Sequence, residues 1–198
     1  MEDISTVFLD RDGVINRLRS DYVLSWDTFT FLPGAKEAIA LLNAVGLRVV
    51  VVTNQRAVAR GLLSDNALAI IHARMRAELA EAGATLDAVY VCPHDKAICD
   101  CRKPGVGLFL QAQRDFPTIA FDRSVVIGDS LSDMQAGSRL GCRLLLVTET
   151  GCATEHANDN AKLAVQKAGI ALDGCAPTLY EAVTRCLIPL VPERAGQL

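Results

Sequence analysis

The stretch VFLDRDG at residues 7–13 places two aspartates directly after a short apolar run. An apolar run that ends in charge is typical of a buried strand in a parallel sheet. The strand would deliver Asp10 to its carboxyl end, and Gly13 would let the chain turn away sharply. Strand-like geometry would also bring the side chain of Asp12 near that of Asp10, because residues two apart share a face. Taken alone, however, such a motif can equally be a charged turn.

The rest of the chain alternates between strand-like and helix-like patterns. Further strands are predicted at 48–52, 88–91, 125–127 and 144–147, with a last short one near 170. Helices are predicted between Gly34 and Gly46 and at 64–82, 106–116, 132–140 and 178–187, with a polar loop at 150–160. This alternation implies parallel pairing through right-handed crossovers, so we expect an α/β fold with an open, Rossmann-like parallel sheet flanked by helices.

Length and composition suit a single domain. The 198 residues are 51% apolar, and we expect one domain over 1–188 and a loosely held tail over 189–198. A net charge of −3 with no long basic run argues against nucleic acid as a partner. We see neither a signal peptide nor an apolar stretch of membrane-spanning length, so we expect a cytoplasmic monomer with no membrane partner.

Polar residues follow several of the predicted strands. Thr53 and Asp129 stand at carboxyl ends of strands, as Asp10 does, and Lys103 lies just beyond the third strand. In an open parallel sheet these ends form the ligand crevice. Two carboxylates, a hydroxyl and an ammonium group that converge there suit a phosphate and a divalent cation. Because all four side chains are expected at the same edge of the sheet, a phosphoryl-transfer site is favoured over a simple charged turn after the first strand.

The residue types match that chemistry. A carboxylate such as Asp10 is a competent nucleophile toward phosphorus once a hard cation offsets the charges, and Mg²⁺ would be held by Asp10 and Asp129. Thr53 can donate a hydrogen bond to a phosphoryl oxygen, and Lys103 adds fixed positive charge. Asp12 can protonate the leaving oxygen and later deprotonate the attacking water.

A second cluster has the spacing C-x-H-x4-C-x-C within residues 92–101. Three thiols and an imidazole can close a tetrahedral Zn²⁺ site with no position left for water, which is typical of structural zinc. The predicted ligands are Cys92, His94, Cys99 and Cys101. Such a site would fix the loop that carries Arg102 and Lys103. The alternative is a chance cluster of reduced thiols, since an odd count of seven cysteines in a chain without a leader predicts free thiols.

Four segments of the chain resemble the motifs of a known family, the haloacid dehalogenase superfamily of phosphatases. The four matching segments are FLDRDGVIN at 8–16, VTNQ at 52–55, RKP at 102–104 and GDSLSD at 128–133. The resemblance implies an aspartyl-phosphate intermediate at Asp10 and Mg²⁺ held by Asp10, the backbone carbonyl of Asp12, and Asp129. Asp133 would orient Lys103 or a metal-bound water, although it can equally be an acidic residue favoured at a helix N-terminus.

The cysteine–histidine loop resembles one branch of that superfamily, the D-glycero-D-manno-heptose-1,7-bisphosphate 7-phosphatases and the histidinol-phosphate phosphatases. The segment TNQRAVARG at 53–61 looks like the heptose-bisphosphatase version of its motif, which would make Asn54 and Gln55 substrate-binding residues. Arg60 and Arg102 could meet a second, non-reacting phosphate of a sugar bisphosphate, or could be solvated surface arginines.

The sequence supports three hypotheses about the function. The first is a sugar-bisphosphate phosphatase acting on a small phosphorylated sugar, and the second is a histidinol-phosphate phosphatase. The third belongs to a different class, a zinc-stabilised binding module without catalysis. Ser130, where the heptose enzymes tend to carry lysine, and the segment 17–22, which lacks their usual Asp-His-Gly-Tyr, depart from the heptose pattern. No insertion is large enough for a full cap domain, so we expect a minimally capped, open crevice.

Overall fold

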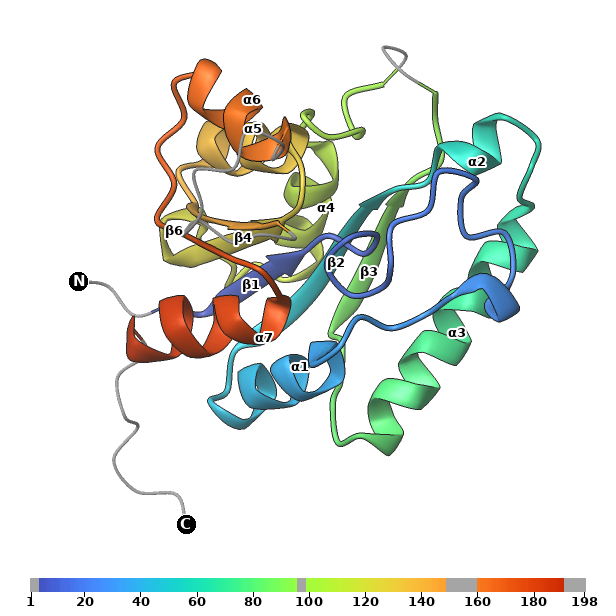
Figure 1. The fold of residues 1–198 in the computed structure, drawn as a ribbon, viewed down its shortest axis with the longest axis horizontal. Helices are drawn as coiled ribbons and strands as arrows, with labels where there is room; N and C mark the ends of the chain where they lie inside the picture. Colours follow the sequence, from blue (N-terminus) through green and yellow to red (C-terminus); the bar gives the residue numbers. More distant parts are fainter. Residues whose placement is uncertain (1–3, 96–98, 149–159, 191–198) are drawn as a thin grey trace.

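The computed structural model describes residues 4–95, 99–148 and 160–190 and forms a six-stranded parallel sheet with helices on both faces (Figure 1). The strand order is β3-β2-β1-β4-β5-β6. The strands are β1 Thr6–Leu9, β2 Arg48–Asn54, β3 Ala88–Cys92, β4 Ser124–Gly128, β5 Arg143–Val147 and β6 Gly174–Ala176. The helices are α1 Ala35–Ala44, α2 Arg56–Ala59, α3 Asp65–Glu81, α4 Gly107–Asp115, α5 Leu131–Leu140, α6 Asn160–Lys167 and α7 Leu179–Glu181.

Strand β1 lies at the centre of the sheet, and its register sets the position of the polar residues that follow it. Leu9 pairs with Val51 of β2 and with Ile127 of β4. The next backbone N–H, that of Asp10, still donates to the carbonyl of Ile127 at 3.0 Å. The order of strands changes direction at β1, because β2 and β4 flank it, and crevices for ligands form at such points.

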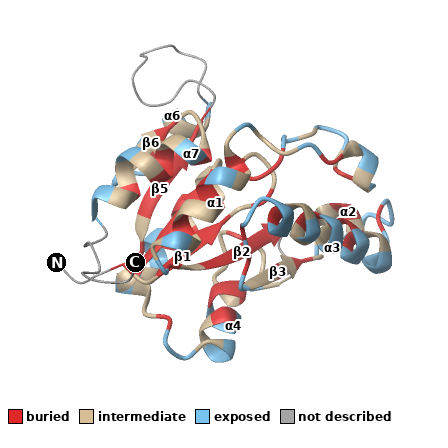
Figure 2. Ribbon diagram, turned by 90° about the horizontal axis from the view of Figure 1, so that it is seen from below, coloured by how far each residue is buried: buried red, intermediate tan, exposed pale blue. Residues whose placement is uncertain are grey.

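Each face of the sheet buries a separate core, and Figure 2 shows β1, β2 and β5 as mostly buried, whereas the edge strand β3 is mostly intermediate. Successive side chains of a strand point to opposite faces, so Val7 and Leu9 of β1 pack toward α1, α3 and α7, whereas Phe8 packs toward α4 and α5. On the second face the rings of Phe8 and Phe109 meet edge to face, with centroids 5.0 Å apart. Helix α3 begins where Ser64 Oγ accepts the backbone N–H of Ala67 at 3.1 Å, as its N-cap position predicts.

The predicted fold class is confirmed, and the differences lie in short or polar elements. The four-residue helix α2 was not predicted. The last strand is β6, which follows the unpredicted helix α6, rather than a strand near 170. With only three residues, β6 has no periodic pattern that a sequence could reveal. The end of the predicted helix 178–187 winds as a π-helix over Ala182–Leu187.

Some of the predicted segments lie outside the described residues, and the prediction about the cysteines is wrong. The predicted loop at 150–160 lies outside the described residues except for Asn160, which begins α6, and most of the tail 189–198 lies outside them as well. The expectation that all thiols are reduced is wrong, because Cys175 is disulfide-bonded. In the part of the chain that the structure describes, no helix has the length and apolar character needed to cross a membrane. Between β1 and α1 the chain forms only a 3₁₀ turn at Trp26–Thr28, in agreement with a minimal cap.

Candidate active site

Three carboxylates meet at the carboxyl edge of the sheet. Asp10 follows β1, Asp129 follows β4, and Asp133 lies in the first turn of α5. Each offers one carboxylate oxygen, and these oxygens all lie within 4.8 Å of one another. The predicted convergence of Asp10 and Asp129 is therefore present, and Asp133 lies beside them.

Lys103 supplies the positive charge of this cluster. Its Nζ lies 3.0 Å from Asp10 Oδ1 and 2.5 Å from Asp133 Oδ1, and it also donates to the carbonyl of Val52 at 2.7 Å. Asn54 fixes the backbone on either side of Lys103, accepting its N–H at 3.0 Å and donating to its carbonyl at 3.2 Å. Burial alone would lower the pKa of Lys103, but attraction to Asp10 and Asp133 outweighs it and raises the pKa. The ammonium group is thus held charged in a buried position.

The carboxylates are crowded enough to resist ionisation. The pKa of Asp10 is raised to about 7, because burial, helped by repulsion from Asp133, outweighs the opposing attraction to Lys103. The pKa of Asp129 is raised to about 8, first by burial and then by repulsion from Asp10 and Asp133. A divalent cation would relieve this repulsion, and two carboxylates with room for water are the oxygen ligands that Mg²⁺ prefers. The residues present therefore fit the metal.

Gly13 makes the close approach of Asp129 possible. A Cβ on Gly13 would lie 2.0 Å from Asp129 Oδ2, and the residue has a φ of +87°. We expect Gly13→Ala to displace the Asp129 carboxylate, weakening Mg²⁺ activation and destabilising the fold by about 1–3 kcal/mol. Chemical denaturation and Mg²⁺ titration of activity measure the two effects. Gly61→Ala is the matched control, since Gly61 has a φ of +68° but nothing within 4 Å of the added Cβ. Equal effects of both variants on Mg²⁺ activation would contradict the clash.

Asp12 lies in a network of donors. Its two carboxylate oxygens accept hydrogen bonds from Arg11 Nη2 at 3.0 and 2.9 Å, from Asn16 at 2.9 Å and from Gln55 at 2.8 Å. Burial pushes the pKa of Asp12 up, but attraction to Arg11 and the hydrogen bonds outweigh it and leave the pKa below its usual range. The side chain of Arg11 is fully buried, whereas that of Asp12 remains 20% exposed. Asp12 is therefore fixed in place and still reachable from the cleft.

The remaining predicted residues of this site are only partly brought together. A cleft of about 320 Å³ is lined by Asp10, Asp12, Leu18, Arg19, Tyr22, Val23, Asn54, Gln55, Arg56, Arg102, Asp129, Ser130 and Ser132. Thr53 is buried behind this lining, and its hydroxyl accepts from Gln55 Nε2 at 2.8 Å. Arg60 is exposed outside the lining and donates to the Tyr22 hydroxyl at 3.1 Å.

The sequence analysis did not single out several of the lining residues, among them Arg19, Tyr22 and Arg56. For Arg19 and Tyr22 the signal available was that the segment 17–22 departs from the related loop, whereas Arg56 lies within the segment TNQRAVARG at 53–61. Tyr22 has a φ of 66°, unusual for a residue with a side chain, and Arg56 pairs with Asp95 beside the cleft. With Arg19, Arg56 and Arg102 on its walls, the cleft combines an acidic floor with a basic rim.

The cysteine–histidine cluster is assembled next to this cleft. Its four ligand atoms lie within 4.8 Å of one another, with His94 Nδ1 3.2 Å from Cys101 Sγ and Cys92 Sγ 3.6 Å from Cys99 Sγ. Tetrahedral zinc with bonds of about 2.3 Å places its sulfur ligands about 3.7 Å apart, so the cluster fits that ion. Residues 96–98 of the intervening loop lie outside the described residues. Arg102 and Lys103 follow the last ligand directly.

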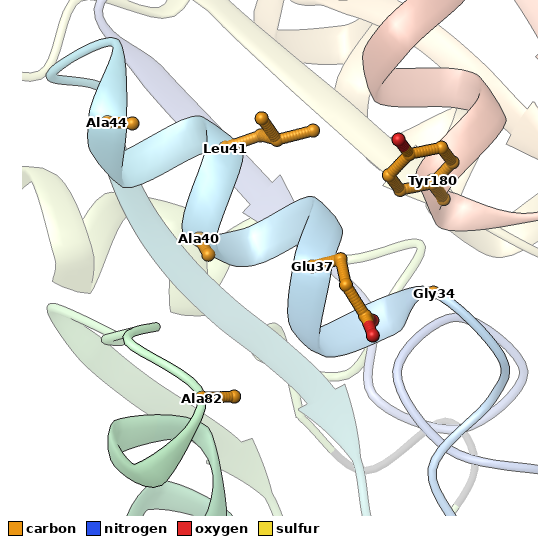
Figure 3. Close-up of a pocket in the computed structure, with 7 residues that line it drawn as sticks. All are labelled: Gly34, Glu37, Ala40, Leu41, Ala44, Ala82 and Tyr180. Carbon is orange, nitrogen blue, oxygen red and sulfur yellow. The ribbon is translucent and has the colours of Figure 1, made fainter.

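A larger hollow of about 570 Å³ lies elsewhere, between α1, the end of α3 and α7 (Figure 3). Alanine, leucine and glycine make up most of its lining, and Glu37 is its only carboxylate. Figure 3 shows Glu37 near Gly34 and Tyr180 on the neighbouring helix. Because this hollow gathers neither paired carboxylates nor a cation, the smaller cleft above Asp10 is the candidate active site.

Comparisons with known proteins point to one group of enzymes. A family model described as HAD-hydrolase-like matches residues 100–180. The D-glycero-beta-D-manno-heptose-1,7-bisphosphate 7-phosphatase of Photorhabdus laumondii is 40% identical over 164 residues, which cover 78% of this chain and 86% of that protein. The D-glycero-alpha-D-manno-heptose-1,7-bisphosphate 7-phosphatase of Mycobacterium bovis is 46% identical over 131 residues, 65% of this chain and 69% of that protein.

A solved structure resembles this chain over nearly its whole length. It is the D,D-heptose 1,7-bisphosphate phosphatase from B. bronchiseptica, complexed with magnesium and phosphate. The TM-score is 0.79 at 32% sequence identity, and the match covers 93% of this chain and 98% of that chain. The similarity therefore extends from the sequence motifs to the arrangement of the whole sheet and its helices.

Proposed function

The chain belongs to the HAD-like hydrolases, in the branch of the heptose bisphosphate phosphatases, and from that premise we propose that it is a Mg²⁺-dependent phosphatase of a sugar bisphosphate. The observation that carries the proposal is the meeting of Asp10, Lys103 and Asp129 at the floor of a cleft whose rim is basic. The substrate we propose is D-glycero-D-manno-heptose 1,7-bisphosphate, which would lose its 7-phosphate.

The reaction divides into two steps. Bound Mg²⁺, held by Asp10, Asp129 and the backbone carbonyl of Asp12, would offset negative charge on the nucleophile and the phosphoryl oxygens. Asp10 Oδ attacks phosphorus, the bond from phosphorus to the sugar oxygen breaks, and Asp12 gives a proton to that oxygen. Only the protonated form of Asp12 can do this, which its lowered pKa makes the minor form at neutral pH. A water then attacks the aspartyl phosphate while Asp12 takes back a proton, which releases inorganic phosphate and regenerates Asp10.

The other site residues would stabilise charge and hold the ester. Lys103 would oppose charge that spreads over the phosphoryl oxygens. Thr53 is buried behind the lining, where its hydroxyl accepts from Gln55 Nε2 at 2.8 Å, so its role would be to hold Gln55 in place. Asp133 supports Lys103 through their 2.5 Å contact. We infer that Asn54 and Gln55 shape the reacting-phosphate end of the cleft, since both line it.

The basic rim supports a substrate with a second phosphate. Arg19, Arg56 and Arg102 line the same cleft as the acidic floor, and guanidinium groups can bind phosphate through two hydrogen bonds at once. Arg60, which the sequence suggested for this role, lies outside the lining but supports Tyr22. We propose that the non-reacting phosphate sits among the lining arginines, with Arg60 acting through Tyr22.

A panel of phosphate esters tests this function. With Mg²⁺ present, both anomers of the heptose 1,7-bisphosphate, the corresponding 7-phosphate and histidinol phosphate are compared by kcat/KM. We expect a bisphosphate to be preferred and ³¹P NMR to show that the phosphate at carbon 1 remains on the product. Fastest turnover of histidinol phosphate would support that alternative activity, and no turnover of any ester would favour the non-catalytic binding module.

We propose that Cys92, His94, Cys99 and Cys101 hold a structural Zn²⁺. All four positions of a tetrahedral ion are then taken by protein atoms, so the metal cannot activate water. Its effect would be mechanical. Arg102 Nη1 donates to the carbonyl of His94 at 3.3 Å, which ties the cluster to the segment that carries Lys103.

Cys99→Ser is expected to lose the zinc, to unfold at lower temperature and to show lower kcat, because Lys103 loses its support. Elemental analysis of protein never exposed to chelator, thermal unfolding and steady-state kinetics measure the three effects. Cys186→Ser is the matched control, since Cys186 is a free cysteine outside the cluster. Wild-type protein with well under one equivalent of zinc, or a Cys99→Ser variant that retains it, would contradict the site.

A further inference from the structure

A line of hydrogen bonds runs from the middle of helix α3 to Asp12. Arg11 lies between them and is fully buried. Its Nη2 donates to both carboxylate oxygens of Asp12 and, at 3.1 Å, to Gln55 Oε1. Its Nη1 lies 3.0 Å from Nε2 of His72, which is 61 positions along the chain. The general acid and base of the proposed reaction is thus tied to a helix that does not line the cleft.

We propose that His72 is a positioning residue for Asp12, acting through the Arg11 guanidinium in the phosphoryl transfer proposed above. A guanidinium has only donors, so the bond requires an unprotonated His72 Nε2 that accepts. The ring must then carry its proton on Nδ1. The inference goes beyond the family motifs, none of which contains His72.

The surroundings of His72 keep its ring neutral. Burial, together with repulsion from Arg11 and Arg76, lowers the pKa of His72 to about 4, although attraction to Asp12 opposes these effects. A neutral ring can accept from Arg11, whereas an imidazolium could not. The contact is therefore a hydrogen bond from a buried cation to a neutral acceptor over the whole neutral pH range.

Arg11 needs this acceptor because it has few others. Among the described residues its Nε is buried without a hydrogen-bond partner, and apart from His72 the guanidinium group bonds only to Asp12 and Gln55. Loss of the His72 acceptor would leave a second buried donor of a charged group unpaired, which is costly. The guanidinium would then turn toward other acceptors or water. Since Arg11 donates two of the four hydrogen bonds to the Asp12 carboxylate, that carboxylate would be displaced.

The test compares how the activity of each variant depends on the leaving group of the phosphate ester. An alkyl phosphate needs a proton on its leaving oxygen, whereas 4-nitrophenyl phosphate releases a stable anion and needs little help from Asp12. We expect His72→Leu to lower kcat/KM for the alkyl ester about tenfold more than for the aryl ester, since kcat/KM reports the step in which Asp10 is phosphorylated. His72→Gln offers a side-chain carbonyl as acceptor and is expected to restore most of the alkyl-ester activity.

A purely structural role for His72 predicts something else. Ile71→Val is the matched control, because Ile71 is the neighbouring residue of α3, is buried in the core and has a side chain that cannot accept a hydrogen bond from Arg11. It is expected to lower stability slightly and to leave the ratio of the two kcat/KM values unchanged. Equal losses on both esters in His72→Leu, or a His72→Gln variant as impaired as His72→Leu, would overturn the proposal.

The hydrogen bond can be examined without any substrate. In ¹⁵N-histidine NMR of the wild-type protein at pH 7, we expect the His72 ring to be neutral with Nε2 unprotonated. A protonated Nε2 would overturn the proposal whatever the activity. Wild-type protein that hydrolyses neither ester would overturn the proposed function together with this inference. Hydrolysis of both esters with equal losses in His72→Leu would overturn this inference alone.

Discussion

Replacing Asp10 by Asn is expected to lower phosphate release by a factor of about 10⁴ or more, because the amide cannot attack phosphorus. The fold should survive. Asp10 is one of three crowded carboxylates, and its pKa is raised by burial and by repulsion from Asp133 and Asp12, which together outweigh attraction to Lys103. A neutral side chain of the same shape relieves that repulsion while still accepting the backbone N–H of Arg11, which donates to Asp10 Oδ1 at 2.7 Å. We therefore expect an unfolding temperature at or above that of the wild type.

Steady-state phosphate release with saturating Mg²⁺ and thermal unfolding, measured on the same preparations, check both halves of this expectation. Asp27→Asn is a suitable control, since Asp27 is an exposed carboxylate in the 3₁₀ turn of the β1–α1 connection. It should leave turnover unchanged. Near-normal turnover by Asp10→Asn would rule out the covalent mechanism.

The second large effect is expected for Lys103→Met, which removes the only buried ammonium group among the described residues. Asp10 and Asp133 would lose contacts of 3.0 and 2.5 Å with its Nζ. Removing one partner of a buried ion pair typically costs about 3–5 kcal/mol, because the other charge is left uncompensated. Turnover should fall about 10²–10³-fold through lost charge stabilisation in the transition state.

Added Mg²⁺ separates the loss of stability in Lys103→Met from its loss of turnover. Added Mg²⁺ should stabilise Lys103→Met more than the wild type, since it neutralises the same carboxylates, yet it should restore little of the turnover. Chemical denaturation with and without Mg²⁺ and phosphate-release kinetics supply the readouts. Lys36→Met is the control, because Lys36 forms a partly exposed pair with Glu78 and neither residue lines the cleft. Full recovery of turnover at high Mg²⁺ would contradict a specific role for Lys103.

Much of the site could be predicted because the carboxyl ends of buried strands can be recognised in the sequence. Apolar runs that stop at a polar residue predicted the strands before Asp10, Thr53 and Asp129, and a parallel sheet must gather those ends at one edge. The spacing of the cysteines and His94 likewise predicted a cluster, since ligands within ten residues can meet without help from the rest of the fold. These inferences use local chain geometry alone.

Other features had no local signal. Helix α2 is a single turn, and β6 has three residues, so neither shows a period in the sequence. Arg56 and Tyr22 line the cleft only because α2 and the segment after β1 approach each other there, whereas Arg60, which looked equally suitable, points outside the lining. Which arginines can reach a ligand depends on how these short segments pack.

The aspartate pair after β1 illustrates the division. The sequence by itself determined the sheet, the order of its catalytic strand ends and the metal-binding spacing, because these follow from hydrophobic periodicity and neighbouring residues. Only the tertiary structure decided how the pair is held: Lys103 from beyond β3 pairs with Asp10, and Arg11, supported by His72 of α3, holds Asp12. These partners are separated by tens of residues. They come together because a buried charge needs an oppositely charged or hydrogen-bonding partner, and a local sequence pattern does not show which distant residue will provide it.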